Sequence, residues 1–183
     1  MKSKSIPYRQ ETHGDFDAEW AIHRNVSGWW YLTGYFNGEG DAENLYSYQF
    51  TVIKPWVYGL SPYALQLAIT DFQTGKHDFL QRFSFFGKDV YVNQNTVNYK
   101  TLARLENHPD RMFLSTRTDL FECDFKLEKG KGAIWHGDDG VLIMGNPVDK
   151  SERTVYYSYT NMPTTGEVRF HNPGGDDRSF LIH

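Results

Sequence analysis

The stretch WWYLTGYFNGEGDAENLYSYQFTVIK, residues 29–54, decides the fold because it predicts two long strands joined by a tight reversal. In its second half, aromatic and aliphatic residues occupy every other position from Tyr46 to Val52, with amide and hydroxyl residues between them. In the first half, neither face is plainly polar. Residues 37–41, which include two glycines, supply the turn. We therefore expect an antiparallel hairpin whose aromatic face can line a cavity.

Further alternating runs continue along the chain and are separated by short turns rich in Gly, Asn, Asp or Pro. These runs are residues 63–71, 77–86, 112–118, 120–128, 154–161 and 168–170, and one more strand begins in the closing SFLIH. Residues 90–97 also suit a strand, whereas residues 97–105 suit a short helix that ends before Pro109. The prediction is a single all-β domain over residues 1–183, folded as an antiparallel β-barrel or a strongly curved β-sandwich with little helix.

Charge and hydropathy exclude several classes of protein. The net charge of −4 and the lack of a basic stripe argue against nucleic acid as the main partner. No run of about 18 apolar residues occurs, so stable membrane insertion is not expected. The first residues, MKSKSIPYRQETHGDF, lack the apolar core of a secretory signal. A cytoplasmic location is therefore expected, unless an export segment precedes the given sequence.

Neither the cysteine nor the N-terminal histidines predict a reactive or metal site. Cys123 alternates with Phe121 and Phe125, which favours a buried thiol over a nucleophile. His13 and His23 lie near several carboxylates, but their spacing matches no common metal motif. We expect no metal and no cofactor.

The glycine-rich segment KGKGAIWHGDDG, residues 129–140, contains the best candidate for acid–base chemistry. His136 with Asp138 or Asp139 could hold a proton near neutral pH, which makes these three the candidate catalytic residues. The alternative, which the sequence favours, is that His136 only hydrogen-bonds the backbone of a turn at the barrel rim.

Aromatic and polar residues of the predicted strands are the candidates for ligand binding. Cross-strand pairing predicts that Tyr46, Tyr48 and Phe50 form one wall with Trp29 and Tyr31. The candidate ligand-binding residues are Trp29, Trp30, Tyr31, Tyr48, Gln49, Arg82 and Tyr157. The tyrosines of residues 154–161 could equally well fill a wide β core. Arg82 must reach water, a ligand anion or a carboxylate, and Asp71 is the nearest carboxylate candidate.

Five segments, in this order, resemble the lipocalin-like CrtC/AttH family, which includes carotenoid 1,2-hydratases, AttH proteins and kievitone hydratase-type sequences. They are WWYLTGYF (29–36), YSYQFTVIK (46–54), LAITDFQTGKHDFLQRFS (67–84), LEKGKGAIWHGDDG (127–140) and YYSYTNMPTTGEV (156–168). The resemblance implies a lipocalin-like barrel that corresponds to the N-terminal half of a two-barrel protein. It also implies that the family's acidic Gly-x-x-Trp-x-Asp-x-Glu-like segment would follow residue 183.

The resemblance implies two functions of different classes. In the first, the chain binds an apolar polyene or terpenoid-like molecule, and the full-length protein is a hydratase or isomerase that protonates an alkene. In the second, the chain is a hydrophobic-ligand-binding module linked to transport, or a support domain, without catalysis. The expected partners are a small apolar ligand and either a second lipocalin-like domain or another copy of the chain.

Overall fold

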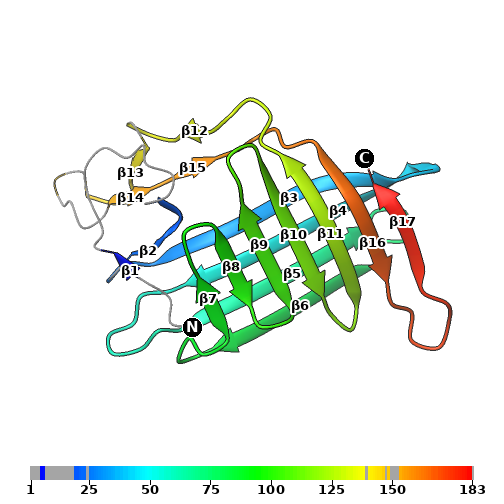
Figure 1. Cartoon of the computed structure of the whole chain (residues 1–183), viewed down its shortest axis with the longest axis horizontal. Helices are drawn as coiled ribbons and strands as arrows, with labels where there is room; N and C mark the ends of the chain where they lie inside the picture. Colours follow the sequence, from blue (N-terminus) through cyan, green and yellow to red (C-terminus); the bar gives the residue numbers. More distant parts are fainter. Residues whose placement is uncertain are drawn as a thin grey trace.

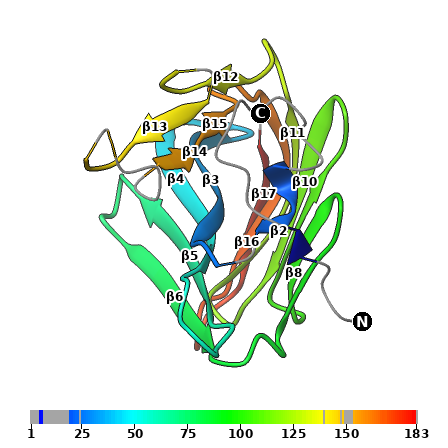
Figure 2. The same cartoon turned by 90° about the vertical axis from the view of Figure 1, so that its left-hand side faces the viewer.

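A computed structural model describes residues 5–6, 19–23, 25–138, 140–146, 148 and 153–182. Its main feature is an antiparallel sheet of 11 strands in the order β6-β5-β4-β3-β17-β16-β11-β10-β9-β8-β7 (Figure 1). The sheet curls into a nearly closed barrel, and Figure 2 shows β5 and β6 on one wall with β8 and β10 on the other. The all-β prediction is confirmed, since the elements with described bounds are all strands.

Most of the predicted strands exist close to their predicted bounds. The strands of the main sheet are β3 (Gly28–Gly38), β4 (Asp41–Lys54), β5 (Tyr63–Asp71), β6 (His77–Ser84), β7 (Val90–Val92), β8 (Thr96–Tyr99), β9 (Ala103–Asn107), β10 (Arg111–Arg117), β11 (Phe121–Glu128), β16 (Thr164–Phe170) and β17 (Arg178–Ile182). Three small pairs lie outside it: β1 (Ser5–Ile6) with β2 (Ile22–His23), β12 (Ile134–Trp135) with β15 (Tyr157–Ser158), and β13 (Val141–Ile143) with β14 (Arg153–Val155).

The predicted hairpin of residues 29–54 is β3 and β4, and its register decides which side chains face inward. Trp30 pairs with Val52, Leu32 with Phe50, and Phe36 with Tyr46. All six of these side chains are buried in the core. Trp29 and Tyr31 pair with Ile53 and Thr51 on the opposite face. The predicted wall that joins these two residues to Tyr46, Tyr48 and Phe50 is therefore wrong, because one step along a strand reverses the side-chain direction.

The barrel interior is one hydrophobic cluster that draws on most strands of the sheet. Cys123 belongs to it, with 3% of its surface exposed, so the predicted burial of the thiol is confirmed. Its Sγ lies 3.1 Å from Thr116 Oγ1 on β10. Burying these aromatic and aliphatic side chains supplies the main stabilisation of a domain that has no disulfide.

Three predictions about secondary structure are corrected. Residues 90–97 form not one strand but β7, a reversal and the start of β8, which pairs antiparallel with β7. Residues 97–105 are not a helix but the end of β8, a reversal and the start of β9, and Lys100 at the reversal has a φ of 48°. The β-branched and aromatic side chains of β8 are buried, so tertiary packing prevails over local helix propensity. Residues 154–161 form two short pieces, β14 and β15, and not one strand. The break occurs at Tyr156, whose N–H donates to the Gly140 carbonyl at 2.9 Å.

The expected pair between Arg82 and Asp71 does not form. Asp71 is buried at the end of β5, where Oδ1 accepts hydrogen bonds from the N–H groups of Gln73 and Thr74. Its charged neighbour is Arg178 on β17, at 3.6 Å. Arg82 lies on the edge strand β6, is exposed, and donates to the Gln81 carbonyl. An edge position lets the guanidinium reach water, which removes the need for a carboxylate.

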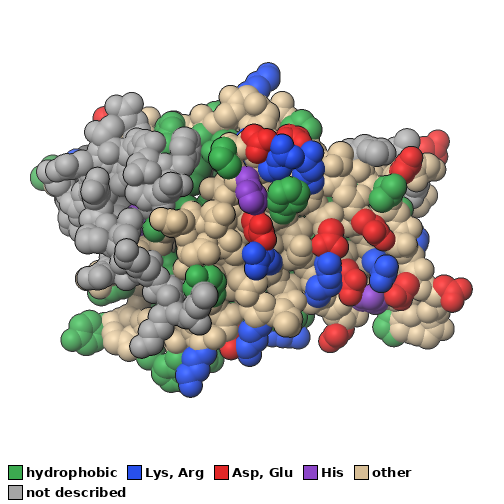
Figure 3. Space-filling view, viewed as in Figure 1, with side chains coloured by type: hydrophobic (Ala, Val, Ile, Leu, Met, Phe, Trp, Pro, Cys, Tyr) green, Lys and Arg blue, Asp and Glu red, His purple; other side chains and the backbone are tan. Residues whose placement is uncertain are grey.

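The outer surface over β9, β10, β11 and β16 carries ion pairs, and Figure 3 shows blue and red side chains alternating there. One pair joins Arg117 to Asp124 at 2.6 Å, and another joins Arg104 to Glu106 at 2.5 Å. These ion pairs lie on the solvent-facing side of the sheet, whereas the side chains on the inner side are apolar. In the part of the chain described, no helix is long and apolar enough to cross a membrane.

Candidate functional site

The candidate site lies along the part of β3 that has no neighbouring strand on one side in the described structure. β17 pairs with β3 only through Ile182 and Gly38, at one end of the strand. Along the rest of β3 the structure describes no strand partner on that side. A strand with a free edge can line a cavity with both of its faces, which alternation alone does not reveal.

A cavity of about 620 Å³, here called the β3 pocket, opens along this free edge. The hairpin lines it with Trp29, Trp30, Tyr31 and Tyr48. Three aliphatic side chains from the opposite barrel wall, Leu105, Met112 and Leu127, face them. The segment of residues 154–160 covers the pocket from outside, and Trp20 and Ile22 also contribute. The volume lies within the range of about 300–1,000 Å³ found for small-molecule sites.

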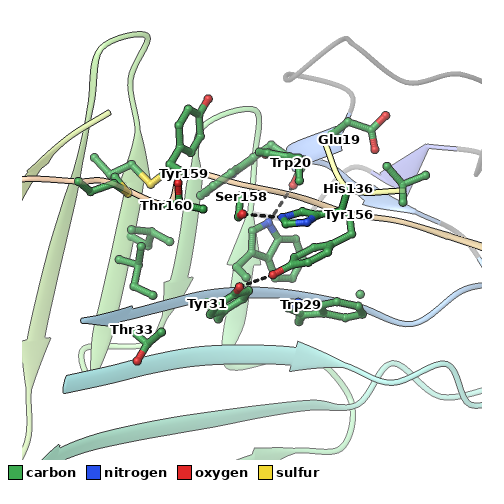
Figure 4. Close-up of a pocket in the computed structure, with 18 of the residues that line it drawn as sticks. Glu19, Trp20, Trp29, Tyr31, Thr33, His136, Tyr156, Ser158, Tyr159 and Thr160 are labelled. Atoms are coloured by element: carbon green, nitrogen blue, oxygen red, sulfur yellow. Dashed lines mark hydrogen bonds between the residues drawn. The ribbon is translucent and has the colours of Figure 1, made fainter. Parts of the chain in front are cut away.

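A polar cluster lies between β3 and the covering segment (Figure 4). The hydroxyl oxygens of Tyr31 and Tyr156 are 2.5 Å apart. The ring of Tyr156 stacks on the imidazole of His136, with centroids 4.3 Å apart and planes at 15°. The other side of the cluster is Ser158, whose Oγ lies 2.7 Å from His136 Nε2. One imidazole and three hydroxyl groups therefore lie together on one side of the pocket.

Three tyrosines that line this pocket, Tyr31, Tyr48 and Tyr157, are neutral at physiological pH. Burial, followed by the hydrogen bond to Tyr156, raises the pKa of Tyr31 to about 12. Burial also raises the pKa of Tyr48 to about 12. The pKa of Tyr157 is raised by burial and then by the charges of Tyr159 and Glu19. Each phenol therefore keeps its proton and can donate it in a hydrogen bond to a ligand.

The structure does not join His136 to Asp138, one of its two candidate carboxylate partners. His136 lies in the pocket, where its backbone N–H donates to the Tyr156 carbonyl at 3.0 Å. Asp138 is exposed and its backbone pairs with Val141, and no hydrogen bond or ion pair between described residues joins it to His136. Asp139 lies outside the described residues. The glycine at 137, with a φ of 72°, turns the chain so that neighbours in sequence point apart.

The predicted ligand-binding residues divide into two groups. Trp29, Trp30, Tyr31, Tyr48 and Tyr157 all line the β3 pocket. Gln49 lies on the outer face of β4, where its amide donates to Thr51, and Arg82 lies on the edge strand β6, so neither lines the pocket.

Several lining residues were not predicted, among them Tyr156, Ser158 and Lys54. Tyr156 and Ser158 lie in a segment whose tyrosines suited a core as well as a pocket. Lys54, the last residue of β4, continues the inward alternation of Tyr46 to Val52, which was a usable signal. Within the described residues, no group of three or more His, Cys, Asp or Glu side chains is arranged to hold a metal ion.

Comparison with known proteins agrees with this architecture. A family model described as AttH-like matches residues 7–176. The chain superposes on the crystal structure of a protein assigned as AttH from Nitrosomonas europaea with a TM-score of 0.77 and 18% identity, over 97% of this chain and 57% of that one. Kievitone hydratase from Nectria haematococca gives a TM-score of 0.60 and 11% identity, over 87% of this chain and 47% of that one. The chain thus spans about half the length of these two structures, and no curated protein sequence matches it.

Proposed function

Since the chain belongs to the AttH-like family and folds as a lipocalin-like barrel, we propose that it binds an apolar small molecule in the β3 pocket. The observation that carries the proposal is the cavity of about 620 Å³ between aromatic side chains of β3 and aliphatic side chains of β9, β10 and β11. Apolar walls with a few convergent polar groups are the usual composition of such sites. A second supporting feature is that the residues that line the cavity come from elements far apart in the sequence.

The lining of the pocket favours a flat or elongated ligand, such as a polyene or a terpenoid-like molecule. Trp29 and Tyr31 present aromatic rings along one strand, and Trp29 lies 6.2 Å from Tyr156 between ring centroids. Leu105 and Met112 supply the facing aliphatic surface. Conjugated carbon chains pack well against aromatic faces, and Met adapts its shape to the ligand.

Tryptophan fluorescence tests binding directly, because Trp20, Trp29 and Trp30 all line the pocket. We expect saturable quenching when the protein is titrated with a retinoid, a carotenoid fragment or a terpenoid. Tyr31→Ala removes a lining ring and should weaken binding about tenfold, equivalent to about 1.4 kcal/mol. Phe85→Ala is the matched control, because Phe85 is an exposed aromatic residue that does not line the pocket. If no apolar ligand quenches the folded protein, the barrel only supports another domain and the proposal is wrong.

A second candidate function is hydration of an alkene, and the stacked His136 and Tyr156 favour it. Hydration adds a proton to one alkene carbon and a water oxygen to the other, and the water then loses a proton. A protonated imidazole can donate the first proton and, once neutral, accept the last, while the faces of Tyr156 and Trp29 stabilise the carbocation between the two steps. Kievitone hydratase, which shares the fold, is by its name a hydratase.

Incubation of the protein with a bound polyene in water enriched in heavy oxygen separates the two candidates. A hydratase would place one heavy oxygen in the product, detected by mass spectrometry, and His136→Gln would reduce the rate about 100-fold or more. Gln keeps a hydrogen-bonding group near Ser158 but cannot carry the proton. Binding without any product, in both the wild-type and the variant protein, would support the binding module and contradict the hydratase.

A further inference from the structure

Lys54 is a charged residue on the inner face of the barrel. It follows Tyr46, Tyr48, Phe50 and Val52 on the inward side of β4 and pairs with Gly28 of β3. It lines the β3 pocket, where it is the only lysine or arginine among the described lining residues. It also lines a second, more polar cavity of about 860 Å³ at the end of the barrel. Its side chain therefore lies where the β3 pocket meets the more polar outer cavity.

No carboxylate of the described residues pairs with this lysine. Its Nζ donates one hydrogen bond, to the Val26 carbonyl at 2.7 Å, and the ion pairs between described residues do not include it. The side chain is half-buried, and burial lowers the pKa of Lys54. An ammonium group has three donors, so at least two remain for another acceptor. A partly buried cation without a counter-ion is destabilising, and a bound anion would relieve that cost.

A second polar group at the pocket also lacks a partner. Trp20 is 4% exposed and lines the β3 pocket, and its indole N–H has no acceptor in the described structure. The Trp20 carbonyl, in contrast, accepts a hydrogen bond from Trp30 Nε1 at 3.0 Å. A buried donor of this kind normally finds a partner, so a pocket that leaves it free favours a ligand with acceptor oxygens.

We propose that the β3 pocket selects an apolar molecule that ends in a carboxylate, with Lys54 binding the carboxylate at the junction of the two cavities. The apolar chain of the ligand then runs between Tyr31 and Met112, away from the more polar outer cavity. This inference rests on the proposed ligand binding and adds a chemical class to it: long-chain or polyene carboxylic acids bind in preference to their uncharged analogues. The Val26 contact suggests the competing explanation, in which Lys54 only ties the loop before β3 to the end of β4.

The experiment compares a long-chain fatty acid with the alcohol and the methyl ester of the same chain length, below the concentrations at which they aggregate. Dissociation constants come from quenching of tryptophan fluorescence at neutral pH. We expect the wild-type protein to bind the acid about tenfold or more tightly than the alcohol, since a hydrogen bond to a charged group contributes about 1.5–3 kcal/mol. Lys54→Met keeps the apolar stem, so it should weaken binding of the acid much more than binding of the alcohol and thereby abolish the preference. Lys88→Met is the matched control, because Lys88 is exposed and lines only the outer cavity.

Each outcome decides between the explanations. Equal binding of acid and alcohol by the wild-type protein overturns the carboxylate inference and leaves the proposed function standing. Binding of none of the three ligands contradicts the proposed function itself. If Lys54→Met weakens acid and alcohol equally, and Lys54→Arg restores stability without restoring selectivity, Lys54 only holds the loop and the inference is wrong. If Lys54→Met does not fold, the comparison of acid with alcohol in the wild-type protein still decides.

Discussion

Gly34 lies directly opposite Tyr48 across the β3–β4 ladder, and a Cβ atom at Gly34 would lie 2.9 Å from Tyr48 Cε1. Both residues line the β3 pocket, so the missing side chain at Gly34 lets the Tyr48 ring lie flat against the strand. Gly34→Ala should push this ring into the pocket, lower the free energy of unfolding by about 1–3 kcal/mol and weaken ligand binding. Urea unfolding and fluorescence titration measure the two effects.

Gly28→Ala is the matched control for this substitution. Gly28 belongs to the same strand and pairs with Lys54, but a Cβ atom there would meet nothing within 4 Å. Removing a glycine from an unstrained position should stabilise the protein by about 0.4–1 kcal/mol, because the unfolded chain loses freedom. Equal effects of the two substitutions would show that Tyr48 adapts without cost.

The hydrogen bond between the hydroxyls of Tyr31 and Tyr156 should affect the pH at which Tyr31 ionises. The hydrogen bond with Tyr156 raises the pKa of Tyr31 together with burial, which contributes more. Tyr156→Phe should therefore lower the pKa of Tyr31 from about 12 without bringing it fully to the ordinary value. Nuclear magnetic resonance of labelled tyrosine, with the Tyr31 signal assigned from Tyr31→Phe, follows this titration. An unchanged pKa in Tyr156→Phe would mean that the two hydroxyls are not bonded in solution.

Asp71 should make the protein sensitive to acid. Burial by itself would raise the pKa of Asp71, but hydrogen bonds from Thr74 and Gln73 and the charge of Arg178 outweigh it, and the pKa is lowered. The folded state therefore holds the ionised form more firmly than the unfolded state does. The resulting stability is present above the unfolded pKa of about 3.9 and is lost as the pH falls through the folded pKa below it.

Asp71→Asn tests this expectation, because the amide cannot titrate. At neutral pH the variant should be about 1–2 kcal/mol less stable than the wild-type protein, since its hydrogen bonds in the turn lose their charge. The difference should shrink as the pH falls below about 4. Asp176→Asn, at an exposed carboxylate, is the control and should leave the curve unchanged. A stability difference that stays constant down to pH 2 would contradict the ionised Asp71.

The sequence predicted the barrel well because its strands depend on local alternation. Tyr46, Tyr48, Phe50 and Val52 point inward, and the residues between them point outward. The turn of residues 37–41 joins two strands that pair along most of their length with each other and, for β4, with the next strand, β5. The predicted helix over residues 97–105 was wrong because the burial of Val97 and Tyr99 prevails over their helical pattern. That burial depends on strands elsewhere in the chain.

The candidate site was less predictable because it depends on long-range contacts. Five of the proposed ligand-binding residues line the β3 pocket, but Tyr156 reaches Tyr31 across 125 residues of sequence, and alternation cannot reveal this contact. The pairing of His136 with Asp138 was inferred from proximity in sequence, whereas the described side-chain contacts of His136 are with Tyr156 and Ser158. The free edge of β3 arises from where β17 joins the sheet, so it could not be derived from the hairpin alone.

Cys123 should make the protein lose stability at alkaline pH and react slowly with thiol reagents. Burial raises the pKa of the Cys123 thiol from 9.0 to about 12, because a thiolate has little solvation among Phe121, Phe125 and their neighbours. A raised folded pKa means that stability is complete below the unfolded pKa and is lost as the pH rises from there through the folded value. Between about pH 9 and 12, Cys123 should therefore reduce the free energy of unfolding by at most about 1.4 kcal/mol per pH unit.

Cys123→Ala isolates this contribution, because it removes the titrating group and keeps a small apolar side chain. The variant should be less stable at neutral pH by about 1–2 kcal/mol, through the lost packing and the lost contact with Thr116, yet its stability should fall less steeply above pH 9. Tyr31 and Tyr63, each with a pKa raised to about 12, keep their own alkaline dependence in both proteins. The pKa of Tyr48 is raised in part by the charge of Cys123, so the difference between the two curves reports Cys123 together with its effect on Tyr48. Labelling with Ellman's reagent gives an independent check: at pH 8 the native thiol should react only as fast as the protein opens, and denaturant should accelerate labelling by orders of magnitude. Complete labelling of the folded protein within seconds, or parallel stability curves for the two proteins above pH 9, would show that the thiol is accessible in solution.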